Sequence, residues 1–368
     1  MHSRNVEVMK QISKNLKIIF YHIVASKYFL PFLPVDANSK NNICIIMMHG
    51  IHNQMMAATS NPPKSSISVS AFESNISLLI RHYQIISLDE AVEMMIGRRS
   101  WRERCAVLTF DDSLRCLVTI AAPLLVAMGL TATFYVSTES IKTQKPYWWM
   151  RLEYAVNHTT KHHAEIKLRH TGQSFSIDGK RPYISLPQLK IALKSIPPQE
   201  VENAMQMIEH ELDASLLDPT SKNPFADLLT WDDVHRLCEL GMTVGSHTIT
   251  HPNLSLLNSN ELHHELRESK NELEAVCRTP VRHLCYPYGY SSAAVRLAAA
   301  DCGYLSGVTT DQPGWNQRGS DPFRLRRFNM PNEPHKISYI LSGKIDIFRS
   351  IKRFSNAEVV KVRKNIFE

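Results

Sequence analysis

The sequence lacks any C-x-x-C pair, although it contains seven cysteines. This absence excludes a thioredoxin-type redox motif and a thiolate zinc cluster. Because the cysteines are scattered and odd in number, they fit a reducing compartment better than a disulfide framework. The cysteine pattern therefore favours a cytoplasmic protein.

Long apolar runs are also scarce near the start of the chain. The apolar stretch at residues 18–33 is interrupted by His22, Lys27 and Pro31, which makes it too short and too polar to assign as a membrane span. His22 also breaks the clean apolar run that a signal peptide needs. We interpret the stretch as a surface or docking helix. The lysines around it leave a membrane-surface segment as the alternative.

No repeat or low-complexity tract is visible. A length of 368 residues fits one large barrel-like domain or two ordinary domains. With 43% hydrophobic and 21% charged residues, the composition excludes a wholly disordered chain. The net charge of +7 permits an anionic partner. Nothing else indicates nucleic acid, and we expect no nucleic-acid partner.

From about residue 43, predicted strands alternate with predicted helices, a pattern typical of an α/β fold with mostly parallel strands. The predicted strands cover residues 43–48, 105–110, 132–136, 242–245, 282–286, 304–309 and 325–330. The predicted helices between them cover residues 69–81, 88–96, 114–128, 231–240, 258–277 and 291–302. Residues 140–225 interrupt this alternation, and we interpret them as an insertion with helices near 187–195 and 199–213. Residues 1–42 form an N-terminal extension, 43–330 the main domain, and 331–368 a basic C-terminal tail.

Two adjacent carboxylates, Asp111 and Asp112, follow the predicted strand at 105–110. Such neighbours repel each other and usually need a cation or a proton to coexist. A plainer interpretation is that Asp112 or Ser113 caps the following helix. The residues alone leave both interpretations open.

His247 and His251 follow another predicted strand and are four residues apart. In a helical turn this spacing places both imidazoles on one face, where they suit a single metal ion. Because the chain has 17 histidines, two exposed loop histidines are the alternative. Combined with an aspartate, the pair makes a three-ligand set that leaves a position open, as in catalytic zinc sites.

Tyr288 lies in a Tyr-Pro-Tyr-Gly segment after a third strand. The segment is either a simple tight turn or a turn whose backbone N–H points at a developing oxyanion. His49, Asp111, His247 and Tyr288 all fall at the C-terminal ends of predicted strands. Barrel enzymes gather their active sites at that face, so the common placement favours one shared site.

Three segments resemble the motifs of the polysaccharide deacetylases, the NodB-like carbohydrate esterase family four. They are VLTFDD at 107–112, SHTITHPNL at 246–254 and CYPYG at 285–289. DPFRLRRF at 321–328 and WWMRLEY at 148–154 resemble segments of a branch associated with bacterial surface polysaccharides. The likeness runs from about Ile43 to Met330. It implies a deformed (β/α) barrel of about seven strands with an inserted helical segment.

The resemblance also implies a chemistry. Asp112, His247 and His251 would bind a divalent metal, with zinc as the expected ion. Asp111 would be the general base, and the Tyr288 backbone N–H would hold the oxyanion. The substrate would be an N-acetylated sugar of a surface polysaccharide or its lipid-linked precursor. Such a precursor would be met at the inner face of the membrane. The basic tail is interpreted as a solvated helix face, with a peripheral membrane or acidic-glycan contact as the alternative.

Two departures from the family's motifs bear on the site. Ser113 stands where the family usually has glycine, and Cys285 stands where many members have an arginine that steers the base. We expect Arg327 to supply that guanidinium. Strand alternation places Arg327 on the inward face, whereas Arg326 shares the face of the apolar Phe328.

The family's late Leu-x-His motif, the source of its general acid, is not evident after residue 330. His335 lies in a predicted proline-rich loop and matches the motif poorly. His49 is the preferred substitute, and a buried structural histidine is the alternative interpretation. Two other functions therefore stay open: an O-acetyl carbohydrate esterase, and a glycan-binding protein that keeps the fold with weakened catalysis.

Overall fold

The computed structural model describes residues 41–59, 62–63, 65–178, 185–214, 225–310 and 313–341. The predicted N-terminal extension, with its surface helix at 18–33, lies outside the described residues except for its last two positions. Most of the basic C-terminal tail also lies outside them. In the part that is described, no helix combines the length and the apolar character that a membrane crossing requires.

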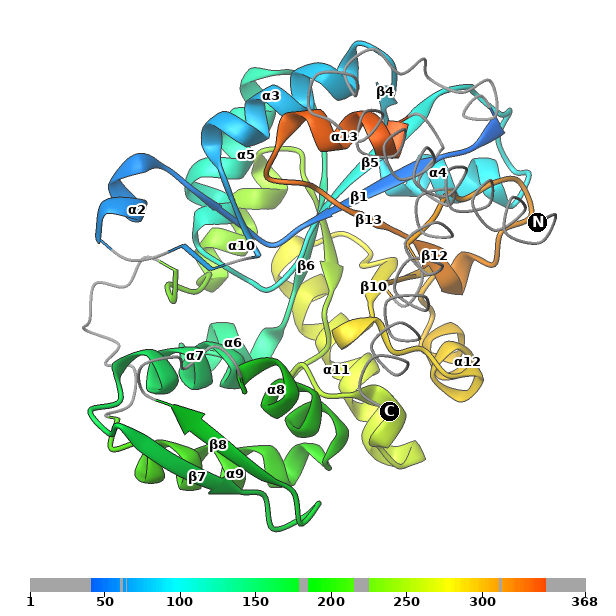
Figure 1. The fold of residues 1–368 in the computed structure, drawn as a ribbon. Helices are drawn as coiled ribbons and strands as arrows, with labels where there is room; N and C mark the ends of the chain where they lie inside the picture. The colour runs from blue at the N-terminus through cyan, green and yellow to red at the C-terminus, as the bar shows by residue number, and fades with distance from the viewer. Residues whose placement is uncertain are drawn as a thin grey trace, which may run out of the picture.

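A parallel sheet curls into a nearly closed barrel (Figure 1), and this confirms the predicted α/β barrel. Its strands follow one another in the order β12-β11-β10-β9-β6-β5-β1-β13, and the short β4 (Gln84–Ile85) pairs with β5. Their bounds are β1 Cys44–Met48, β5 Cys105–Phe110, β6 Thr133–Val136, β9 Thr243–Ser246, β10 His283–Cys285, β11 Ser306–Thr309, β12 Leu325–Arg326 and β13 Phe328–Asn329.

The last predicted strand closes the barrel in two halves. β12 pairs with β11, and β13 pairs with β1, so the chain joins the two ends of the sheet where it passes through Arg327. Counting the two halves as one strand recovers the seven predicted strands. The division at Arg327 was not predicted.

Helices cover the outside of the barrel (Figure 1). They are α3 Val69–Ile80, α4 Leu88–Met95, α5 Ala122–Ala127, α10 Trp231–Glu239, α11 Ser259–Cys277, α12 Ala293–Asp301 and α13 Pro334–Leu341. The short strands β2 (Gly50–His52) and β3 (Ser66–Ser68) pair beside the barrel, with α2 (Gln54–Thr59) between them. Successive side chains of the strands pack into two different apolar clusters: Ile45 and Val107 belong to a cluster that contains Tyr135 and residues of α4, whereas Ile46 and Leu108 belong to the larger cluster shared with the other barrel helices.

One predicted helix and one predicted loop need correction. The predicted helix at 114–128 starts only at Leu117, as a π-helical turn over Leu117–Ala121 that continues into α5. Before it, Asp112 and Ser113 adopt left-handed backbone angles, and Leu114 makes an isolated bridge with Leu228. The predicted loop around His335 is also wrong, since that residue belongs to α13.

The insertion folds beside the C-terminal ends of the barrel strands (Figure 1). Its elements are α6 Thr138–Thr143, α7 Trp148–His158, β7 His163–Lys167, β8 Ser174–Asp178, α8 Leu186–Ser195 and α9 Pro198–Glu211. Leu152, Ile166, Leu189 and Ile208 form a separate apolar core for it. The two predicted helices are present, but the antiparallel hairpin of β7 and β8 was missed, so the insertion is not wholly helical.

Gly245, in β9, has no room for a side chain, because the ring of Tyr135 lies against it inside the barrel. A Cβ at Gly245 would stand 2.6 Å from two Tyr135 ring carbons and 3.0 Å from the His283 carbonyl oxygen. We predict that Gly245→Ala lowers the free energy of unfolding by about 1–3 kcal/mol, because overpacking displaces the ring or the strand. Urea denaturation measures the change. Leu297→Ala, on an exposed position of α12, is the control, and equal midpoints for both variants would contradict the prediction.

Candidate active site

Asp112, His247 and His251 converge beyond the ends of β5 and β9, and all three are buried. The Nε2 atoms of the two histidines are 3.1 Å apart, and Asp112 Oδ1 lies 3.5 Å from His247 Nε2 and 3.7 Å from His251 Nε2. Zinc ligands at about 2.0–2.2 Å in a tetrahedron are separated by roughly 3.4 Å. The three atoms therefore fit one metal ion with a further position open.

The two histidines meet without the predicted helical turn. His247 follows β9 directly, and left-handed backbone angles at Thr248 and His251 bring the second imidazole back toward the first. Glu265 of α11 holds this bend, because its carboxylate accepts hydrogen bonds from the N–H groups of Ile249 (2.8 Å) and Thr250 (3.1 Å). Glu265 was not predicted, because no local motif marks it.

Hydrogen bonds and burial set the state of the imidazoles. His247 Nδ1 lies 2.8 Å from the Cys285 carbonyl oxygen and donates there, so Nε2 is the nitrogen that faces Asp112. Burial alone would lower the pKa of His247, but neighbours that include Asp112 raise it, so a metal bound at Nε2 would displace a proton. Burial, together with the neighbouring His247, lowers the pKa of His251 to about 3. His251 is therefore neutral, as a metal ligand must be.

The Asp112 carboxylate is ionised. Burial alone would raise the pKa of Asp112, but the surrounding histidines outweigh it and lower the pKa below its usual value. The alternative interpretation, a helix cap, is wrong for both candidate residues. The N-cap of the next helical turn is Cys116, without a side-chain cap, and Ser113 Oγ instead accepts from the Ser137 N–H at 2.8 Å.

Asp111 is clamped by Arg327 inside the barrel. Arg327 Nη1 and Nη2 donate to the two Asp111 carboxylate oxygens at 2.8 Å each. The same guanidinium contacts Thr109 Oγ1 and Cys285 Sγ, both at 3.1 Å. Burial would raise the pKa of Asp111, but the Arg327 charge lowers it. Of the two neighbouring arginines, Arg327 is the buried inward one and Arg326 is exposed.

Asp111, His247 and Cys285 form a second cluster with metal-ligating atoms. It fits a metal less well, because both Asp111 oxygens already accept from Arg327. Burial also raises the pKa of the Cys285 thiol, which disfavours the thiolate that a metal needs. The Asp112 set is therefore the candidate metal site.

His49 and Tyr288 lie at the edge of this site. His49 Nε2 is 3.9 Å from Asp112 Oδ2, and its side chain is 26% exposed. Tyr288 has a left-handed backbone (φ 59°) in the turn Pro287–Gly289. Its hydroxyl accepts from Trp148 Nε1 at 2.8 Å and donates to the His251 carbonyl oxygen at 3.3 Å. Sequence analysis considered only the Tyr288 backbone and missed this bridge.

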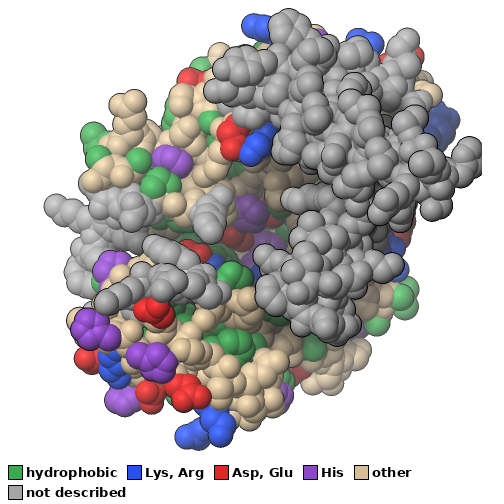
Figure 2. All heavy atoms as spheres, viewed as in Figure 1, with side chains coloured by type: hydrophobic (Ala, Val, Ile, Leu, Met, Phe, Trp, Pro, Cys, Tyr) green, Lys and Arg blue, Asp and Glu red, His purple; other side chains and the backbone are tan. Residues whose placement is uncertain are grey.

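A cavity of about 650 Å³ opens above these residues, and Figure 2 shows histidine and acidic side chains at the bottom of a hollow. The barrel contributes the predicted site residues His49, Asp111, Asp112, His247, His251, Tyr288 and Arg327 to its lining. The insertion contributes Trp149, Met150, Glu153, Lys190 and Lys194. The cavity thus lies between the barrel and the insertion.

Comparisons with known proteins find similarity to the polysaccharide deacetylases. Residues 199–307 match the family model of the polysaccharide deacetylases, a segment that contains His247, His251 and Tyr288. The chitooligosaccharide deacetylase of Sinorhizobium fredii (strain NBRC 101917 / NGR234) is 31% identical over 91 residues, 24% of this chain and 42% of that protein. The match therefore spans less than half of that curated relative.

Solved structures show the same fold over most of the chain. The deacetylase PplD of Streptococcus pyogenes, in complex with acetate, superposes with a TM-score of 0.53 at 17% identity and covers 81% of this chain and 97% of that one. A de-N-acetylase from Aggregatibacter actinomycetemcomitans gives a TM-score of 0.50 at 17% identity, with 78% and 94% covered. Together the comparisons confirm the resemblance to the polysaccharide deacetylases.

The ligand geometry predicts metal binding. We expect purified protein to hold about one divalent ion per chain and to lose it in His247→Ala and Asp112→Ala. Metal analysis of folded, dialysed protein measures this, with circular dichroism to verify folding. His49→Gln, at the same cavity but outside the three-ligand set, should retain the ion. A wild type without metal after incubation with zinc or cobalt would rule out the site.

Proposed function

We propose that the protein is a metal-dependent deacetylase that hydrolyses N-acetyl groups on a carbohydrate. The observation that carries this proposal is that a candidate metal site and a candidate general base lie next to each other in one cavity. Asp112, His247 and His251 form an open metal site, and the adjacent Asp111 is an oriented, ionised carboxylate held by Arg327. In metal-assisted hydrolysis of an amide, the ion polarises the carbonyl and a base beside it accepts the proton of the attacking water.

A divalent ion held by Asp112, His247 and His251 would polarise the acetyl carbonyl and lower the pKa of water. Asp111 then accepts the proton of the attacking water, and Arg327 holds that carboxylate in position. The water oxygen adds to the carbonyl carbon, and the Tyr288 backbone N–H donates to the resulting oxyanion. When the carbon–nitrogen bond breaks, His49 protonates the leaving amine, and acetate departs.

The comparisons support the substrate class. One relative is named a chitooligosaccharide deacetylase and one fold neighbour was solved with acetate, which suits an acetylated saccharide as substrate and acetate as product. As part of the proposal, the sugar belongs to a surface polysaccharide or its lipid-linked precursor, and zinc is the ion. The seven free cysteines favour a cytoplasmic location at the inner membrane face.

Acetate release tests the proposed reaction. Chitin oligosaccharides and matched O-acetylated sugars are incubated with wild type and Asp111→Asn. We expect release from the amides, and a fall of about 10²–10⁴-fold in the variant, because the general base is lost. The metal content should stay unchanged. Turnover of esters alone would make the protein an O-acetyl esterase. Binding of acetylated sugars without any release would make it a glycan-binding protein.

Arg327 and Arg326 offer a matched pair of variants. Lysine keeps the charge of arginine but cannot form the two parallel hydrogen bonds that orient Asp111. We predict that Arg327→Lys lowers kcat about 10²-fold, because the base is misplaced, whereas Arg326→Lys, on the exposed side, has little effect. Steady-state kinetics with metal analysis measures both. Equal kcat values would show that Asp111 needs no clamp.

A further inference from the structure

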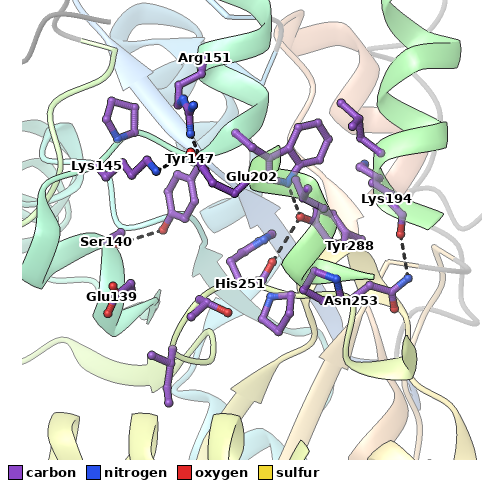
Figure 3. Close-up of a pocket in the computed structure, with 18 of the residues that line it drawn as sticks. Glu139, Ser140, Lys145, Tyr147, Arg151, Lys194, Glu202, His251, Asn253 and Tyr288 are labelled. Carbon is purple, nitrogen blue, oxygen red and sulfur yellow. Dashed lines mark hydrogen bonds and ion pairs between the residues drawn. The ribbon is translucent and has the colours of Figure 1, made fainter. Parts of the chain in front are cut away.

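Helix α8 of the insertion contributes two lysines to the active-site cavity. Lys190 and Lys194 are four residues apart, on successive turns, and both line the 650 Å³ cavity. Lys194 also lines a second cavity of about 280 Å³, which lies between the insertion and the barrel. Figure 3 shows Lys194 beside Tyr288. Lys194, His251 and Tyr288 line both cavities.

The two lysines differ in their partners. Lys190 forms an ion pair with Glu153 of α7. Lys194 Nζ lies 4.8 Å from the centre of the Tyr288 ring, and no acid among the described residues is within ion-pair distance. The Lys194 backbone carbonyl accepts from Asn253 Nδ2 at 3.0 Å, which fixes this part of the helix against the barrel.

An unpaired, half-buried ammonium costs free energy that an aromatic face offsets only in part. Burial and the neighbouring Lys190 lower the pKa of Lys194, and the charge of Asp112 offsets this only in part. Two pairs of charges in the cavity cancel: Arg327 pairs with Asp111, and Glu153 pairs with Lys190. Asp112 is the remaining acid of the lining, and a divalent ion held there would more than neutralise it. In the metal-loaded protein Lys194 would therefore add to an excess of positive charge in the cavity.

We infer that Lys194 binds an oxyanion of the substrate, a carboxylate or a phosphate carried by the saccharide near the acetylated sugar. This inference rests on the proposed function and narrows its substrate class from acetylated to anionic acetylated saccharides. The 280 Å³ cavity beside Lys194 offers room for the unit that bears the charge. The site then discriminates through one hydrogen-bonded charge pair between Lys194 and that oxyanion.

Equilibrium binding of paired probes tests the inference. The carboxylate pair is a hyaluronan tetrasaccharide and its methyl ester. The phosphate pair is N-acetylglucosamine 1-phosphate and methyl N-acetylglucosaminide. Calorimetry is performed on the metal-loaded and on the chelator-treated full-length protein, because a metal ion can itself attract an anion. The variants are Lys194→Met and, as the matched control, Lys190→Met.

We expect wild type to bind the charged member of at least one pair about 10-fold or more tightly than its neutral partner. Lys194→Met should abolish this preference, Lys194→Arg should restore it, and Lys190→Met should keep it. Preference within the carboxylate pair alone indicates an acidic sugar, and preference within the phosphate pair alone indicates a phosphate-linked one.

Equal binding of charged and neutral probes by wild type, or a preference that survives in Lys194→Met, would overturn the inference. Failure of the proposed function has a different signature. In that case acetate is not released from any acetylated sugar, whereas the Lys194-dependent preference in binding persists. Circular dichroism of each variant separates both outcomes from misfolding.

Discussion

The buried ion pair between Asp111 and Arg327 connects the closure of the barrel to the chemistry of its site. Arg327 lies between the two half-strands that join β11 to β1, and its guanidinium crosses the interior to the end of β5. Removing either partner would strand a charge in the core, which typically costs about 3–5 kcal/mol. The geometry of the base and the integrity of the fold therefore depend on one contact.

Around this pair, strained backbone positions and residues of the insertion shape the rest of the site. Asp112, Thr248, His251 and Tyr288 have left-handed backbone angles where the chain leaves the strands. Such angles persist only when surrounding contacts hold them. Glu265 supplies that support for the histidine bend, and Trp148 supplies it for Tyr288. The cavity thus combines ligands from the barrel with a second layer from α7, α8 and α11.

Much of the fold follows from local patterns, because strand and helix periods and the capping box at Asn258 depend on neighbouring residues. Strand alternation also singled out Arg327 as the inward arginine. The hairpin of β7 and β8 escaped prediction because β7 buries only Ala164 and Ile166, too few for a clear pattern. Glu265 and the Tyr288 hydroxyl escaped because tertiary contacts define their positions, and no spacing along the chain reports those contacts.

The bridge from Trp148 through the Tyr288 hydroxyl to the His251 carbonyl couples the insertion to the barrel. Trp149 also packs against the His251 ring, with centroids 4.7 Å apart. The segment that lines the cavity therefore also supports a candidate metal ligand. An engineered replacement of this insertion would have to rebuild the support of His251, so the shape of the cavity and the geometry of the candidate metal site cannot be altered independently.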